Sequence, residues 1–309
     1  MTRTPPTRDP IDALLAAPDG AVLAIIAGVE GPSYRPVGAI MTVFSETERA
    51  GTLSSGCIEA DISLHAMACA KTGQPRLLRY GRGSPFVDIQ LPCGGGLDIL
   101  LVPRPDRALL SEVAENRRMR AACSLCIDTE TGAMALQDKG ATGRNGDQLI
   151  VRFEPSIRFL IFGKGPEAST FAALVQSAGY PNLLLSPDPE TLEDGASSGC
   201  KTRHITQQSF PDDLGVDDRT AVILFFHDHD WEPPILAGAL DTQAFYIGAQ
   251  GSRRARDARH LMLQSMGVGD DAIARLHGPV GLIPSARDAG TLAVSVLAEV
   301  LAKAMARAA

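Results

Sequence analysis

Residues 159–168, FLIFGKGPEA, decide the fold of the C-terminal half of the chain. Four apolar residues lead into Gly163, and the spacing G-x-G-x-x-A continues into a segment of helical character. A strand that turns into a helix in this way is typical of a Rossmann-like nucleotide-binding sheet. We expect Gly163 and Gly165 to let backbone N–H groups approach a phosphate, which the positive end of the helix dipole also favours. The alternative is a tight strand-to-helix turn that binds no ligand.

The sequence after this turn repeats the same rhythm, because each apolar run of four to six residues precedes a helical stretch. Such alternation predicts a parallel sheet with helices between its strands. The predicted strands span residues 158–162, 182–186, 202–205, 221–226 and 244–247. The predicted helices span residues 167–178, 233–240, 253–266 and 288–306, with a weak one near Glu190.

The end of the second predicted strand bears on which nucleotide could bind. A NAD site needs an acidic residue there to hold the ribose hydroxyls. Ser186 stands at this position, and Asp188 follows two residues later, beyond a proline. This weakens the case for a dinucleotide, and a mononucleotide or a pterin diphosphate fits equally well.

Residues 225–231, FFHDHDW, place ionisable side chains where the fourth strand ends. Ligands of parallel sheets bind along this carboxyl edge. His227 is therefore a candidate for holding a ligand or moving a proton, and a metal site here is a weaker hypothesis. The alternative is that one acidic residue caps the next helix while the others are solvated.

Residues 246–254, YIGAQGSRR, form a second junction between a strand and a helix. Gly251, Ser252 and Arg253 would lie at the helix start, with Ser252 as its N-cap, and an anion could bind there. The alternative is a solvated helix face made of arginines, which we expect to describe at least two of Arg254, Arg256 and Arg259.

The chain before Pro155 has a different character. Its predicted strands span residues 21–27, 39–44, 77–80 and 97–102, its helices span 58–71 and 106–119, and shorter strands lie between 122 and 153. Because 309 residues exceed what one hydrophobic core usually organises, two domains are expected. We expect an α/β protein with a mixed α/β domain over residues 1–154, beginning with a frayed tail of ten residues, and a Rossmann-like parallel sheet over 155–309.

Two cysteines of the N-terminal half stand in unusual surroundings. Cys57, within SSGCIE at 54–59, lies at a predicted helix start, where the dipole lowers a thiol pKa and favours thiolate. Cys93 lies in the glycine-rich stretch LPCGGG at 91–96. Together they would be a pair of soft metal ligands, and the alternative for each is a small buried hydrophobe. Cys123 and Cys126 have C-x-x-C spacing without a second pair, so we expect no zinc there.

Composition and charge exclude several classes of function. The net charge of −7 disfavours a protein that binds nucleic acid through its phosphate backbone. The first ten residues lack the apolar run of a signal peptide, and no stretch has the roughly 20 uninterrupted apolar residues of a membrane helix. We therefore expect a cytoplasmic protein that binds no membrane, with its six cysteines as thiols.

Several segments, taken in order, resemble the XdhC/CoxI family of xanthine dehydrogenase accessory proteins. The segments are GPSYRPVGAIM at 31–41, SGCIE at 55–59, PCGG at 92–95, YIGAQGSRR at 246–254, HGPVGL at 277–282 and AVSVLAE at 293–299. The resemblance therefore covers both halves. The chain departs from the family pattern at Pro166, where a histidine is usual, at Ser186, where an acidic residue is usual, and at Ser55-Gly56, where a double glycine is usual.

The resemblance implies a chaperone rather than a catalyst. Such a protein would bind molybdopterin-type molybdenum cofactor, protect it while its terminal sulfur is installed, and deliver it to a molybdenum hydroxylase such as xanthine dehydrogenase. A cysteine desulfurase would be a further partner, and we expect a homo-oligomer. The resemblance also implies a set of site residues in this chain. They are Arg35, Cys57, Glu59, Cys93, His227, Gly251, Ser252 and Arg253.

The leading hypothesis joins both lines of argument. The thiols of Cys57 and Cys93 would approach the molybdenum or its sulfur, while Gly163, Gly165 and the helix start at Arg253 hold phosphate. One alternative is an NAD(P)-dependent oxidoreductase with His227 as acid or base. Another is an interaction scaffold that binds no cofactor.

Overall fold

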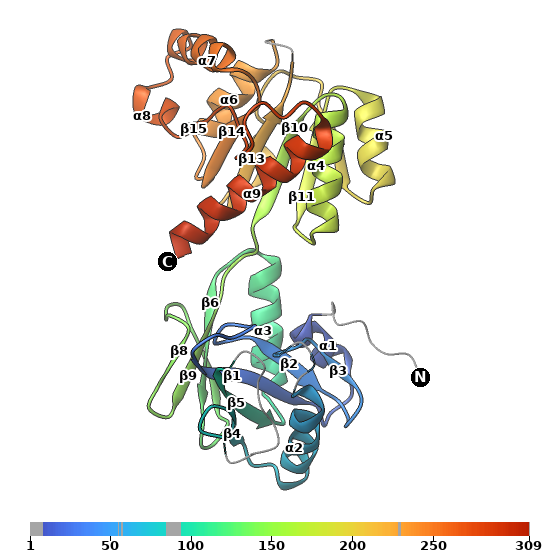
Figure 1. Ribbon diagram of the computed structural model, residues 1–309, viewed down its shortest axis with the longest axis vertical. Helices are drawn as coiled ribbons and strands as arrows, with labels where there is room; N and C mark the ends of the chain where they lie inside the picture. Colours follow the sequence, from blue (N-terminus) through green and yellow to red (C-terminus); the bar gives the residue numbers. More distant parts are fainter. Residues whose placement is uncertain (1–8, 55, 57, 85–93, 228–229, 309) are drawn as a thin grey trace. The chain divides into compact units, whose positions relative to one another are not determined.

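The computed structural model describes residues 9–54, 56, 58–84, 94–227 and 230–308 (Figure 1). Contacts divide the chain into two compact units, one ending at Pro155 and the other beginning at Ser156. Both units combine helices with sheets, and the second contains a parallel sheet. The predicted fold class is confirmed.

The N-terminal unit contains two antiparallel sheets, with strand orders β3-β2-β1-β5-β4 and β7-β6-β9-β8. Its elements are α1 (Pro10–Ala16), β1 (Val22–Glu30), β2 (Ile40–Val43), β3 (Arg49–Ala50), α2 (Glu59–Thr72), β4 (Arg76–Gly81), β5 (Gly96–Pro103), α3 (Arg107–Arg118), β6 (Cys123–Asp128), β7 (Met134–Gln137), β8 (Gly143–Asn145) and β9 (Gln148–Phe153).

The central strand β1 is apolar and buried from Val22 to Ala27 because both faces of its sheet are covered there. Side chains alternate along a strand, so Val22 and Ile26 pack towards α2, whereas Leu23 and Ile25 pack with α1, α3 and the second sheet. All four are fully buried. This unit therefore has two hydrophobic layers, one on each side of its five-stranded sheet.

The C-terminal unit is a six-stranded parallel sheet with the order β12-β11-β10-β13-β14-β15. Its elements are β10 (Arg158–Gly163), α4 (Pro166–Ser177), β11 (Asn182–Ser186), α5 (Pro189–Ser197), β12 (Lys201–His204), the 3-10 helix η1 (Asp212–Leu214), β13 (Thr220–Phe225), α6 (Glu232–Leu240), β14 (Tyr246–Ala249), α7 (Arg253–Ser265), α8 (Asp270–Ile273), β15 (Leu276–His277) and α9 (Ala289–Ala308). In this doubly wound order the direction of winding reverses between β10 and β13, and ligands bind at the carboxyl ends of such strands.

Helices cover both faces of this sheet, with α4 and α9 on one face and α6, α7 and α8 on the other (Figure 1). By length and composition alone, α9 could cross a membrane. Its residues Val296, Val300 and Ala304 nevertheless belong to the core beneath it. We therefore treat α9 as a core helix of this unit.

Some local predictions were wrong. The fifth strand spans Tyr246–Ala249, two residues later than expected, because Ala244 and Phe245 precede the ladder with β13. The predicted tail is too long, since the Asp9 carboxylate caps α1 by accepting hydrogen bonds from the backbone N–H of Ile11 and Asp12. The short elements α1, α8 and β15 were not predicted, because they are too short for periodicity to be read.

Candidate functional site

One end of the five-stranded sheet gathers the loops that carry the predicted cofactor residues of the N-terminal unit. Glu30 ends β1 and pairs with Gly96, which begins β5, and Gly81 at the end of β4 pairs with the same Gly96. Helix α2 starts nearby, because the Tyr80 hydroxyl donates to Asp61 Oδ2 over 2.6 Å. The loops after β1, before α2 and before β5 therefore emerge at the same end of this sheet.

Two of these loops are in direct contact. The loop before β5 is closed at its base, where the Arg82 backbone N–H donates to the Gly95 carbonyl over 3.1 Å, and this brings Gly95 against the loop after β1. A Cβ added at Gly95 would lie 2.3 Å from the Pro32 carbonyl oxygen, so only glycine permits this approach. Gly95, the middle residue of the triple glycine, thus packs closely against the segment that leads to Arg35.

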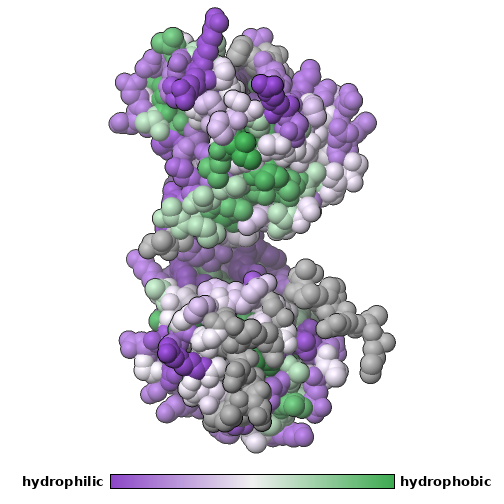
Figure 2. Space-filling model, viewed as in Figure 1, coloured by the Kyte–Doolittle hydropathy of each residue, from purple (hydrophilic) through white to green (hydrophobic). Residues whose placement is uncertain are grey.

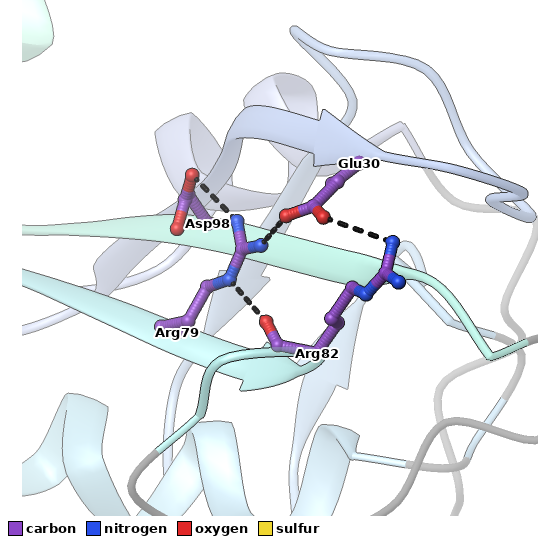
Figure 3. Close-up of polar contacts among 4 residues, drawn as sticks. All are labelled: Glu30, Arg79, Arg82 and Asp98. Carbon is purple, nitrogen blue, oxygen red and sulfur yellow. Dashed lines mark hydrogen bonds and ion pairs between the residues drawn. The ribbon is translucent and has the colours of Figure 1, made fainter.

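An ion-pair network connects the strands at the same end of the sheet (Figure 3). The Arg79 guanidinium in β4 pairs with Asp98 Oδ2 in β5 at 3.1 Å and with the Glu30 carboxylate in β1, and its Nε donates to the Arg82 carbonyl over 2.8 Å. The Arg82 side chain reaches the other oxygen of Glu30 at 3.4 Å. The network ties three strands together where their loops begin, so it positions these loops. Its members were not predicted from the sequence.

Glu59 holds the loop before α2. The carboxylate is 1% exposed and accepts hydrogen bonds from the Thr52 hydroxyl at 2.6 Å and from the backbone N–H groups of Leu53 and Ser54 at 3.1 and 2.8 Å. Its second oxygen accepts from the Ser54 hydroxyl at 2.7 Å and the Ile58 N–H at 3.3 Å. Burial alone would raise the pKa of Glu59, but these hydrogen bonds lower it to about 2. Both oxygens are therefore engaged by the loop that contains Cys57.

Cys57 and Cys93 themselves lie outside the described residues. Their neighbours Gly56 and Gly94 are exposed and have positive φ angles of 102° and 68°. Arg35 is also exposed, and its guanidinium lies 5.4 Å from the ring centre of Tyr34. Arg35 is thus accessible to an anionic ligand.

The described cysteines are poor candidates for metal or sulfur chemistry. Cys69, Cys123, Cys126 and Cys200 are all buried. Burial raises the pKa of Cys69, Cys123 and Cys200, which keeps these groups as neutral thiols. Within the described ranges, no group of three or more histidine, cysteine, aspartate or glutamate side chains is placed to hold a metal ion.

The glycine turn of the C-terminal unit is closely packed. A Cβ at Gly163 would lie 2.7 Å from the Phe225 carbonyl oxygen, to which the Lys164 N–H donates over 3.1 Å. Gly165 adopts a φ of 90°, and its N–H donates to the Thr191 hydroxyl over 2.8 Å. Pro166 has no N–H to offer. The turn therefore uses the N–H groups of Lys164 and Gly165 internally, and a phosphate would have to displace Thr191 or bind further along α4.

The end of β11 is also occupied by internal hydrogen bonds. The Thr191 hydroxyl donates to Asp188 Oδ2 over 2.5 Å, and Ser186 Oγ accepts from the Asp188 N–H at 3.1 Å. The hydrogen bonds from Thr191 lower the pKa of Asp188, as does nearby Lys164. A cavity of about 140 Å³ beside Lys164 and Asp188, also lined by Phe226 and Trp231, is too small for a whole nucleotide.

Three polar side chains meet at the carboxyl edge between β10, β13 and β14. His227 Nε2 lies 3.6 Å from Glu167 Oε2 and 3.2 Å from Gln250 Nε2, and the His227 side chain is 71% exposed. The buried Gln250 Oε1 has no hydrogen-bond partner among the described residues. His227 and Glu167 could exchange a proton with a ligand at the edge, and Gln250 could accept a hydrogen bond from it. Glu167 and Gln250 were not proposed from the sequence, although both lie inside motifs that it singled out.

The start of α7 has the predicted cap. Ser252 Oγ accepts from the Ala255 N–H at 3.1 Å, Gly251 has a φ of 139°, and Arg253 is exposed. Arg254 is exposed and Arg256 is partly exposed, in line with a solvated face for two of the three arginines, whereas the third, Arg259, is 5% exposed and pairs with the buried Glu232. It has a structural role.

Comparison with known proteins covers both units. Residues 159–300 match the family model described as the XdhC Rossmann domain, and residues 14–81 match the XdhC and CoxI family. The molybdenum cofactor insertion chaperone PaoD of Escherichia coli (strain K12) is 34% identical over 94% of this chain and 85% of its own length. A probable xanthine dehydrogenase subunit of Bacillus subtilis (strain 168) is 24% identical over 94% and 95%. The crystal structure of a xanthine dehydrogenase (BH1974) from Bacillus halodurans shares the fold, with a TM-score of 0.78, 22% identity and coverage of 96% and 95%.

Proposed function

Since the chain belongs to the XdhC and CoxI family, we propose that it binds molybdenum cofactor and delivers it to a molybdenum hydroxylase such as xanthine dehydrogenase. The observation that carries this proposal is the 34% identity to a molybdenum cofactor insertion chaperone across both units. A cysteine desulfurase that supplies the terminal sulfur of the cofactor completes the proposed set of partners.

The N-terminal unit contains the candidate residues for binding the metal. Cys57 and Cys93 belong to loops whose described parts emerge at one edge of the sheet, and thiolates suit a soft metal centre and its sulfur ligands. Arg35 lies on the third loop of this edge and would pair with an anionic group of the cofactor. Glu59 would act by positioning the Cys57 loop, because its carboxylate is already engaged by that loop.

The C-terminal unit offers a candidate phosphate site of its own. The capped helix start formed by Gly251, Ser252 and Arg253 combines the helix dipole with an exposed guanidinium. Gly163 and Gly165 shape the neighbouring turn, which a phosphate would reach only after a change at Thr191. His227 would contact the ligand at the same carboxyl edge of the sheet.

The thiol mechanism predicts a loss of molybdenum in cysteine variants. The Cys57→Ala/Cys93→Ala double variant, isolated from cells that make molybdenum cofactor, should retain less than about one tenth of the molybdenum bound by the unchanged protein, because two soft ligands are removed. Metal analysis of the purified proteins measures this. Cys126→Ala removes a buried thiol of β6 and serves as the control, with retention expected to be unchanged. Full retention by the double variant would contradict the thiol mechanism.

The competing function is that of an NAD(P)-dependent oxidoreductase. The doubly wound sheet and His227 are the features in its favour. Against it, Ser186 replaces the ribose-binding acid, Asp188 is held by Thr191, and the Gly165 N–H is engaged. We therefore expect calorimetric titration with NAD and with NADP to show no saturable binding at submillimolar ligand. Tight binding of either would favour the oxidoreductase over the chaperone.

A further inference from the structure

The Thr191 hydroxyl closes the glycine turn between β10 and α4. It accepts a hydrogen bond from the Gly165 N–H at 2.8 Å and donates one to Asp188 Oδ2 over 2.5 Å. Thr191 belongs to α5 and is 2% exposed, so its hydroxyl is fixed by packing as well as by these two bonds. The turn after β10 is therefore connected to the end of β11 by a buried side chain.

This hydroxyl occupies the position that a bound dinucleotide needs. In a doubly wound sheet the diphosphate of NAD lies against the backbone N–H groups of the turn after the first strand. Here the Lys164 N–H donates to the Phe225 carbonyl. The Gly165 N–H donates to Thr191, and Pro166 has no N–H. The turn thus has the glycine spacing of a nucleotide-binding sheet, but residues 164–166 offer no free N–H to a diphosphate.

Two carboxylates lie close to the same turn. Glu167 Oε2 is 3.8 Å from the position that a Cβ at Gly165 would take. Asp188 accepts from the hydroxyl that also holds the turn, and this hydrogen bond lowers the pKa of Asp188 and keeps it ionised. The basic groups that face them are Lys164, beside Asp188, and His227, whose Nε2 lies 3.6 Å from Glu167. A diphosphate at the turn would therefore add negative charge next to two carboxylates.

We propose that Thr191 sets the ligand selectivity of the C-terminal unit by excluding the diphosphate of dinucleotides such as NAD. A diphosphate can bind the turn only after the hydroxyl leaves, and both of its hydrogen bonds are then lost. The same bridge holds the Asp188 carboxylate, which would otherwise be available to a ribose hydroxyl. Unfavourable contacts with the wrong ligand are a general means of specificity. The use of this selectivity rests on the proposed function, because a carrier of molybdenum cofactor has to remain free of the other nucleotides of the cell.

The cavity beside this bridge provides a direct measurement of ligand entry. It has a volume of about 140 Å³ and is lined by Lys164, Pro187, Asp188, Phe226 and Trp231. Trp231 is the single tryptophan of the chain. A dinucleotide whose ribose reaches Asp188 extends to this cavity, so its binding should quench the fluorescence of Trp231.

Titration of the full chain with NAD, followed by Trp231 fluorescence, tests the proposal. The unchanged protein and Thr191→Ser, which keeps the hydroxyl, should show no saturable quenching at submillimolar NAD. Thr191→Ala frees the Gly165 N–H and the Asp188 carboxylate together, and it should bind NAD at least about tenfold more tightly than the unchanged protein. The variant keeps the cap of α5, because Asp188 also accepts from the backbone N–H of residue 191 at 3.0 Å. Far-UV circular dichroism and melting curves verify that it is folded.

A second substitution tests the part played by charge. Glu167→Gln, added to Thr191→Ala, removes a carboxylate close to the turn and should increase the affinity for NAD further. Glu193→Gln is the matched control, since Glu193 is an exposed acid of α5. It should leave the affinity of Thr191→Ala unchanged.

Exposed apolar surface elsewhere in this unit is a second place where the rings of NAD could adsorb. Figure 2 shows hydrophobic surface gathered over α9, and Val294 and Met305 of this helix are 55% and 61% exposed. Trp231 packs against the core on the opposite face of the sheet, so adsorption at α9 should not quench it. Val294→Ser in the Thr191→Ala protein should therefore leave the quenching by NAD unchanged.

Three outcomes would each overturn the proposal. They are tight binding of NAD by the unchanged protein, binding by Thr191→Ser equal to that of Thr191→Ala, and a folded Thr191→Ala that gains no affinity. The first would also count against the proposed function. The other two would not, because molybdenum retention by the unchanged protein is measured separately.

Discussion

Replacing Glu232 by alanine should destabilise the C-terminal unit by about 3–5 kcal/mol, because it leaves a buried guanidinium without its counter-charge. Arg259 makes two hydrogen bonds of 3.0 Å to the Glu232 carboxylate, and both side chains are less than 5% exposed. Arg259 also donates to the Gln250 carbonyl over 2.8 Å, so the pair supports the backbone that leads into Gly251 and Ser252. We therefore expect the start of α7 to loosen as well.

Urea unfolding followed by tryptophan fluorescence measures this effect in one unit alone. Trp231 is the single tryptophan of the chain, and it immediately precedes α6 in the C-terminal unit. Arg254→Met, on the exposed side of the same helix as Arg259, should change the free energy of unfolding by less than about 0.5 kcal/mol. The double variant Glu232→Leu/Arg259→Met removes both charges and should recover most of the loss. A small effect of Glu232→Ala would show that the pair is dispensable.

Acidification should remove stability from the N-terminal unit through Glu59. Its pKa is about 2 in the folded unit against an ordinary value of 4.5. A carboxylate with a lowered pKa contributes stability that is complete above about pH 4.5 and is lost as the pH falls towards 2. A shift of this size corresponds to roughly 3 kcal/mol. The unchanged protein should therefore lose stability steeply between pH 4.5 and 2.

The Glu59→Gln variant isolates this contribution. An amide cannot ionise and cannot accept all five hydrogen bonds, so the variant should be less stable at pH 7 and show a shallower loss between pH 4.5 and 2. Unfolding followed by far-UV circular dichroism at several pH values measures the difference. Glu112→Gln, on the exposed face of α3, is the control and should match the unchanged protein. Parallel curves for Glu59→Gln and the unchanged protein would refute the assignment.

Glu59 also shows what a sequence can predict and what only a structure can show. The resemblance to a family marks Glu59 as a site residue, which stays a prediction, and the structure adds that its buried carboxylate accepts five hydrogen bonds from residues 52–58. A sequence shows that an acidic residue begins a helix; it does not show which loop folds back onto that residue. Arg259 is a similar case, since the sequence did not show which of three arginines would be buried, and its partner Glu232 lies on a different helix.

By itself the sequence determined the local structure of the C-terminal unit and the class of its sheet. Apolar runs of strand length, helical stretches between them and the glycines at 163 and 165 are local features, and the periodicity of side chains along a strand or a helix is enough to recognise them. Only the tertiary structure decided that the Gly165 N–H meets Thr191, that Arg79 joins three strands, and that α9 keeps an apolar face exposed. Each of these depends on residues that are distant in the chain and are brought together by packing, and their distances are not encoded in any local pattern.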